Sequence, residues 1–226
     1  MTGSKNERYL LLDIIRGVAV TLMIFFHLFY DLDLFKFVNI DFQKDTFWFV
    51  LPRVIVTLFL FSVGMSLALA HKKGLRLRPY LHRLAKIGIG ALLISLFTYF
   101  AFPKNWIYFG TLHCIFFLSI ICVPFLKFKK TGLIVAIFLL ALEVMNKQIP
   151  FFELSHASMD YIPIFPWLAV SLIGIYCSGF SFYKAYIPYN NASKPLVFLG
   201  QHAFKIYIIH QPILFGIVYL ISVFMA

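Results

Sequence analysis

Seven hydrophobic segments alternate with shorter polar connections along the chain. They cover residues 9–30, 48–70, 85–102, 109–126, 131–146, 163–180 and 203–224. Because a helix needs about 20 predominantly apolar residues to cross the hydrocarbon core of a bilayer, each segment is a candidate span. The pattern predicts an all-α integral membrane protein, a bundle of about seven transmembrane helices that form a single domain over residues 1–226.

Basic residues gather in every second connection, which is typical of the cytoplasmic side of a membrane protein. They lie before the first segment and after the second, fourth and sixth: Lys5, Arg8, Lys72, Lys73, Arg76, Arg78, Arg83, Lys86, Lys127, Lys129, Lys130, Lys184 and Lys194. Most acids lie in the other connections. We therefore expect a multi-pass protein of the cell (plasma or inner) membrane, with its N-terminus cytoplasmic and its C-terminus outside.

The composition supports the membrane assignment and narrows the partners. Hydrophobic residues make up 62% of the 226 residues, above the 45–50% or so of soluble domains. The net charge of +11 follows from the connections, so anionic lipid head groups explain it better than nucleic acid does. The three cysteines fall inside predicted spans and indicate neither a disulfide framework nor a metal site.

The first segment carries four ionisable residues, Asp13, Arg16, His27 and Asp31. Eleven residues are about three helical turns, so Arg16 and His27 fall within roughly 20° of each other and about 16 Å apart along the axis. Asp13 and Asp31 extend the same face at i−3 and i+4. Ionisable groups in a span are costly unless they face protein or water. This helix should therefore turn the four residues toward a polar cavity inside the bundle.

His27 and Arg16 are the first candidates for chemistry. A carboxylate at Asp31 can orient the His27 imidazole and stabilise its charged form, which suits a general base. The alternative is a salt bridge of small value at a helix end. A guanidinium in a span needs an anion, so Arg16 either pairs with Asp13 or contacts a phosphate or thioester carbonyl, and the two roles can coexist.

Two further groups of polar residues stand out. Arg78, His82, Arg83 and Lys86 lead into the third segment, where they either follow from topology alone or bind a polyphosphate cofactor. The other group lies in spans and consists of His113, Glu143, Tyr207, His210 and Gln211. Tyr207, His210 and Gln211 share one helix face. Hydrogen bonding between helices is the alternative to a role in chemistry for each residue of this second group.

Five stretches in order, LDIIRGVAVTLMIFFHLFYDL, the basic second connection, FGTLHCI, FPWLAVSLIG and LGQHAFKIYIIHQPIL, carry a family resemblance. The chain resembles the heparan-alpha-glucosaminide N-acetyltransferase catalytic-domain-like family, within the wider transmembrane acyltransferases. The resemblance implies a membrane-embedded transferase that takes an acyl group from cytoplasmic acyl-CoA and passes it to a hydroxyl or amine at the far side. Arg16 and His27 match, in type and spacing, an Arg and a His that are important in the related acyltransferase-three proteins.

The preferred hypothesis is an acyl-CoA-dependent O- or N-acyltransferase with acetyl-CoA or another acyl-CoA as donor and no metal. We expect His27, Asp31 and Arg16 to be catalytic. The expected cofactor-binding residues are Arg16, Arg78, His82, Arg83 and Lys86. The residues expected to contact the substrate or to support the catalytic residues are His113, Tyr207, His210 and Gln211. Its partners would be a carbohydrate or lipid-linked acceptor and the lipid bilayer, with no nucleic acid, and a homo-oligomer stays open. A small proton-coupled transporter or flippase, or a structural subunit, is the alternative.

Overall fold

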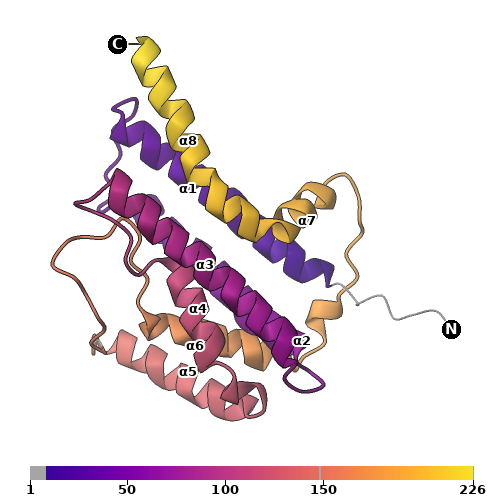
Figure 1. The fold of residues 1–226 in the computed structure, drawn as a ribbon. Coiled ribbons are helices and arrows are strands. Elements are labelled where there is room, and N and C mark those ends of the chain that lie inside the picture. The colour runs from indigo at the N-terminus through magenta and orange to yellow at the C-terminus, as the bar shows by residue number, and fades with distance from the viewer. Residues whose placement is uncertain (1–8, 148, 226) are drawn as a thin grey trace. The chain divides into compact units, whose positions relative to one another are not determined.

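The computed structural model describes residues 9–147 and 149–225, whose regular secondary structure is helical. The helices are α1 (Leu10–Leu34), α2 (Thr46–Ala70), α3 (Leu77–Ala101), α4 (Thr111–Ile121), α5 (Lys129–Val144), α6 (Ile164–Cys177), α7 (Ser193–Gln201) and α8 (Ala203–Met225), with the 3-10 helices η1 (Pro124–Leu126) and η2 (Phe182–Lys184). Within these residues the only strand-like pairing is one bridge between Phe109 and Tyr161. The predicted all-α class is therefore confirmed (Figure 1).

Each predicted hydrophobic segment contains a helix, but within residues 9–147 and 149–225 only α1, α2, α3 and α8 are long and apolar enough to cross a membrane. Helices α4, α5 and α6 have 11, 16 and 14 residues. At about 1.5 Å per residue they cover about 16–24 Å, less than the ~30 Å hydrocarbon core. Four spans are therefore supported, and the count of seven and the orientation of the termini stay predictions.

The chain forms two compact units, and the boundary falls inside α2. The first comprises Met1–Phe59 and Ser181–Ala226, and the second comprises Leu60–Phe180. The single domain expected over the whole chain stays a prediction.

In the first unit α1 packs along both α7 and α8 (Figure 1). The apolar core joins α1 to the first half of α2 and contains the buried residues Ala19, Val20, Met23, Leu51, Ile55 and Phe59. Gly17 of α1 and Gly200 of α7 lie against the partner helix's backbone, where a β-carbon would overlap a carbonyl oxygen. These glycines let the two backbones approach closely, as small residues do between membrane helices.

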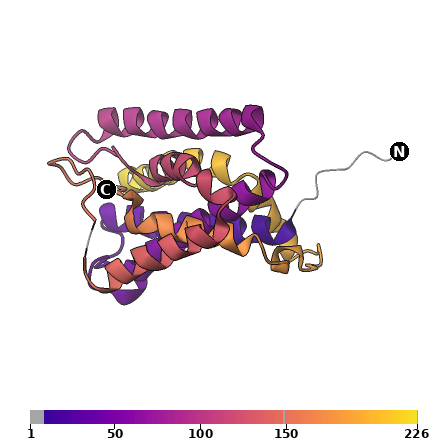
Figure 2. The same ribbon diagram turned by 90° about the horizontal axis from the view of Figure 1, so that it is seen from below.

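In the second unit α5 and α6 lie side by side in both views (Figures 1 and 2), and α4 contacts α3 and α6. Close packing also joins α6 to the second half of α2, because Gly174 lies against the Phe61 carbonyl group. Ser171 Oγ donates to the Leu60 carbonyl oxygen at 3.0 Å. Large apolar side chains on α3, such as Phe100 at 78% exposed, point outward, as expected of a helix that faces lipid.

Candidate functional site

The four ionisable residues of α1 lie where this helix meets α7 and α8. Asp13 and Asp31 are buried, at 4% and 0% exposed, and His27 is half-buried. Asp13 contacts the last residue of α7, while His27 and Asp31 contact residues of α8. The face of α1 that carries these four residues, called the stripe below, therefore points to the interior of the first unit. Packing with the C-terminal helices explains how a span tolerates these groups.

Asp13 holds the end of the stripe that we expect on the cytoplasmic side. Arg16 Nη1 lies 3.3 Å from Asp13 Oδ1, so the predicted ion pair is present. Gln201 Nε2 donates to Asp13 Oδ2 at 3.4 Å. A guanidinium carries five N–H donors in a planar fork, so an Arg that pairs with one carboxylate can still bind a phosphate or a carbonyl group.

His27 and His210 form a pair of imidazoles between α1 and α8. Their ring centroids are 4.8 Å apart and the rings are perpendicular, at 89°. His27 Nδ1 lies 2.9 Å from the Met23 carbonyl oxygen, and His210 Nδ1 lies 2.7 Å from that of Tyr207. A carbonyl oxygen can only accept, so each Nδ1 carries a proton and donates it. In its neutral form each ring then has its lone pair on Nε2.

Asp31 is bound by Gln211 of α8, whose Nε2 donates to Asp31 Oδ1 at 2.8 Å. The ring of His27 is oriented by the backbone carbonyl group one turn earlier, at Met23. Asp31 lies one turn after His27 on the same helix face, and its carboxylate is held by Gln211. A role for Asp31 toward His27 stays a prediction.

Three acceptor atoms in this cluster have no hydrogen-bond partner within the described part of the chain: Asp31 Oδ2, His210 Nε2 and Gln211 Oε1. All three are buried. Buried polar atoms are nearly always paired, because an unmade bond costs about 1–3 kcal/mol. Tyr207 borders the cluster through the contact of its ring with His210, at 5.7 Å between centroids.

The basic residues at the start of α3 belong to the second unit. Arg78, His82 and Lys86 are exposed, and Arg83 is half-buried. His71, in the preceding connection, accepts a hydrogen bond from the backbone N–H of Arg76 at 3.1 Å. Burial, followed by the charges of Arg83 and Arg76, lowers the pKa of His71 below its usual range. This neutral histidine fixes the connection ahead of the basic turn.

His113 also lies in the second unit, and both of its ring nitrogens are bonded within the fold. Its Nδ1 accepts from the backbone N–H of Gly110 at 3.1 Å, so Nε2 carries the proton and donates to Ser95 Oγ at 3.0 Å. Ser95 Oγ donates in turn to the Ile107 carbonyl oxygen at 2.7 Å. These bonds tie the start of α4 to α3, and a part in chemistry for His113 stays a prediction.

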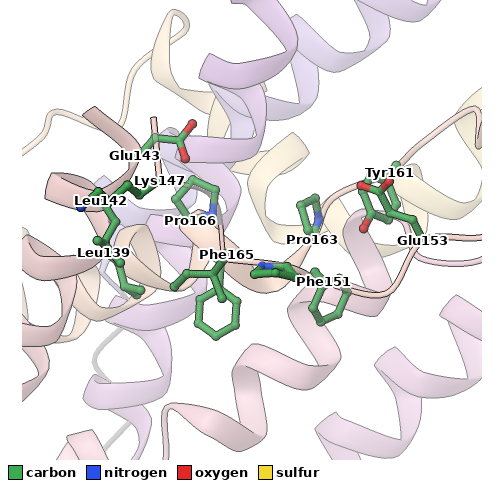
Figure 3. Close-up of a pocket in the computed structure, with 12 residues that line it drawn as sticks. Leu139, Leu142, Glu143, Lys147, Phe151, Glu153, Tyr161, Pro163, Phe165 and Pro166 are labelled. Carbon is green, nitrogen blue, oxygen red and sulfur yellow. The ribbon is translucent and has the colours of Figure 1, made fainter. Parts of the chain in front are cut away.

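A cavity of about 540 Å³ lies in the second unit and is drawn in Figure 3. Its polar lining consists of Glu143, Lys147, Glu153 and Tyr161. Figure 3 shows Glu143 and Glu153 at opposite ends, with Pro163 and Phe165 between them. Burial and the nearby Glu153 raise the pKa of Tyr161 to about 12, so its phenol stays neutral and donates to the Phe152 carbonyl oxygen. Of these four polar residues, Glu143 alone is among the candidates that the sequence analysis names.

Four helices of the described residues are long and apolar enough to cross a membrane, and α1 carries buried ionisable residues, a combination typical of a membrane protein with polar groups inside its fold. The family model described as heparan-alpha-glucosaminide N-acetyltransferase, catalytic, matches residues 8–212, a range that includes Arg16, His27 and His210. The chain belongs to this family, a family of membrane acetyltransferases, and the predicted resemblance is confirmed. No curated protein matches the chain, and no solved structure matches it.

Proposed function

We propose that this protein is an acyltransferase embedded in the cell membrane. It moves an acyl group, acetyl in the first place, from a cytoplasmic acyl-CoA to a hydroxyl or amine of a sugar-like or envelope acceptor at the outer side. Membership of the acetyltransferase family supports acyl transfer in general. The observation that carries the proposal for this chain is the His27–His210 pair beside a buried Asp31.

Each of the four ionisable residues of α1 has a role in the proposed reaction. Arg16 binds the donor, through a CoA phosphate or the thioester carbonyl group, while Asp13 holds its side chain. His27 presents the lone pair of Nε2, which either takes a proton from the acceptor or takes the acyl group itself. The charge of Asp31 stabilises the imidazolium that both routes create.

The other residues have supporting tasks. Arg78, His82, Arg83 and Lys86 bind the phosphates of CoA, since they bring several positive groups to the first turns of a helix. Gln211 positions Asp31 by donating to its carboxylate, and the backbone carbonyl group of Tyr207 positions the His210 ring. His113 keeps the start of α4 in place.

Acyl transfer measured in membrane vesicles tests the proposal. We expect His27→Ala to lower transfer from radiolabelled acetyl-CoA by about 100-fold or more, a usual effect of losing an acid–base or nucleophilic group. Arg16→Ala should raise the KM for acetyl-CoA. His202→Ala is the matched control, because His202 Nδ1 also bonds a carbonyl oxygen one turn earlier, at 2.9 Å, but lies outside the pair. Wild-type rates in both test variants at equal expression would refute the site.

A proton-coupled transporter or flippase is the second candidate, which a buried carboxylate and two imidazoles in spans favour. Thermal unfolding of detergent-solubilised protein with and without CoA separates the two. A CoA-binding enzyme is stabilised by about 2.7 kcal/mol at a concentration 100 times Kd, whereas a protein that does not bind CoA shows no change.

A further inference from the structure

The cluster at Asp31, His210 and Gln211 has more buried acceptors than donors. One N–H of Gln211 Nε2 is donated to Asp31 Oδ1, while Gln211 Oε1 is an acceptor without a partner among the described residues. His210 Nδ1 is engaged with the Tyr207 carbonyl oxygen, which leaves Nε2 as an acceptor. Asp31 Oδ2 is a carboxylate oxygen. Among the residues that the structure describes, the buried atoms of this cluster that have no partner are therefore three acceptors.

This pattern restricts the group that can occupy the cluster. Lone pairs repel a carbonyl oxygen or an oxyanion, so these atoms cannot stabilise the oxygen of a thioester during transfer. They suit a group that donates hydrogen bonds, such as a hydroxyl or an amine. In an acyl transfer, the acceptor substrate brings such a group, whereas the thioester does not.

We propose that Asp31, His210 and Gln211 form the subsite for the reacting O–H or N–H group of the acceptor, and that His210 Nε2 takes its proton. The inference rests on the proposed function and deepens it. His210 is then a catalytic base beside His27, whose ring centroid is 4.8 Å away. With the acceptor's proton assigned to His210, the two routes for His27 reduce to one, in which His27 carries the acyl group.

The two half-reactions balance. In the first, the lone pair of His27 Nε2 forms a bond to the acyl carbon, the C–S bond breaks, and CoA leaves as a thiolate with the electron pair. In the second, the acceptor's proton passes to His210 Nε2 as its oxygen or nitrogen bonds the acyl carbon. The C–N bond to His27 then breaks and the pair returns to His27. His210 then releases one proton and the CoA thiolate takes up one, so no net proton is gained or lost.

A comparison of two nucleophiles tests the role of His210. Hydroxylamine is nucleophilic without a base, so its conversion to acetyl hydroxamate with acetyl-CoA requires only the first half-reaction and an accessible acyl group. Transfer of radiolabelled acetyl to an envelope extract requires the base as well. We expect His210→Gln to lower labelling of the extract by about 100-fold and hydroxamate formation by less than about threefold. His27→Gln should abolish both.

Equal losses of both products in His210→Gln would overturn the inference, since they would indicate a structural role, and so would unchanged labelling of the extract. A wild-type protein that forms neither product would refute the proposed function itself. That result is distinguishable because the wild type, and not only the variant, fails.

A second experiment adds a readout, the unfolding temperature, that does not depend on activity. In Asp31→Asn the side-chain oxygen can still accept from Gln211, while the new N–H₂ group supplies the donors that the cluster lacks. We expect the unfolding temperature to rise by about 2–4 °C, a shift equivalent to about one hydrogen bond in a chain of this size, while labelling of the extract is lost. Asp45→Asn, at an exposed carboxylate, is the control, and its unfolding temperature should not rise. An unfolding temperature of Asp31→Asn at or below that of the wild type would contradict a shortage of donors.

Discussion

Gly200 of α7 lies directly against the backbone carbonyl group of Asp13 on α1. A β-carbon at residue 200 would overlap that carbonyl oxygen, and backbone cannot move aside as a flexible side chain can. Gly17 makes the reciprocal contact with the Leu196 carbonyl group. The same crossing places Gln201 on the Asp13 carboxylate, so the close approach of two backbones sets the position of Asp13 and of the Arg16 that pairs with it.

Alanine at Gly200 or Gly17 should therefore destabilise the fold and weaken the proposed donor site together. We expect each substitution to lower the free energy of unfolding by about 1–3 kcal/mol, a typical cost of overpacking, and to raise the KM for acetyl-CoA. Gly216→Ala on α8 is the matched control, because nothing lies within 4 Å of its β-carbon position. That control should be neutral or gain up to about 1 kcal/mol from helix propensity. Unfolding in detergent measures the change in free energy for the two test variants and for the control. Equal changes at the three positions would contradict the close contact.

The hydrogen bond between Gln211 and Asp31 makes a separate prediction. Gln211→Leu leaves the buried carboxylate without its donor, so we expect a loss of about 1.5–3 kcal/mol in the free energy of unfolding. Replacing both partners, as in Asp31→Leu/Gln211→Leu, removes the unmade bond and should recover most of that loss. A double-mutant cycle measures the coupling, and additive losses would show that the two side chains do not interact.

The face of α1 that carries Asp13, Arg16, His27 and Asp31 was predictable from the sequence, because helical periodicity alone aligns these residues. The Arg16–Asp13 pair follows from the same spacing. The contacts of Gln201 with Asp13 and of Gln211 with Asp31 join residues 188 and 180 positions apart. No local pattern encodes such pairs, so the sequence placed Gln211 among the site residues but did not supply its partner.

Other features of the fold had no sequence signal for a different reason. Helix α7 has 9 residues, too few for the hydropathy pattern of a span, and lies in the connection before the last hydrophobic segment. The cavity of the second unit takes much of its lining from the connection between α5 and α6, where backbone conformation follows no period. The structural bonds of His113 depend on Ser95 of a different helix, so a polar residue in a span could not be assigned to structure or chemistry from the sequence alone.

The exposed basic residues at the start of α3 should affect donor binding more than chemistry. We expect Arg78→Ala/His82→Ala/Lys86→Ala to raise the KM for acetyl-CoA by roughly tenfold, at up to about 1 kcal/mol for each exposed contact, with kcat little changed. The difference should shrink at high salt, since the screening length falls to about 3 Å at 1 M. Lys44→Ala/Lys104→Ala, which removes basic residues from the connections expected outside, is the control. Equal KM values for the two variants would assign the basic turn to topology alone.

His71 provides a test by pH outside the spans. Burial and the charges of Arg83 and Arg76 lower its pKa in the folded protein below the ordinary 6.5. A base whose folded pKa is lowered binds its proton more readily in the unfolded state. It therefore leaves stability unchanged above pH 6.5 and reduces it as the pH falls from 6.5 toward the lowered folded value. Because the protonated ring can no longer accept from the Arg76 N–H, the connection before α3 should loosen over the same range.

We expect unfolding temperatures between pH 7.5 and 5 to fall less steeply in His71→Gln, which does not titrate, than in the wild type. His156→Gln, at a histidine in another connection, serves as the control. A His71 signal in labelled protein that titrates at or above 6.5 would show that the ring is not held in its neutral form.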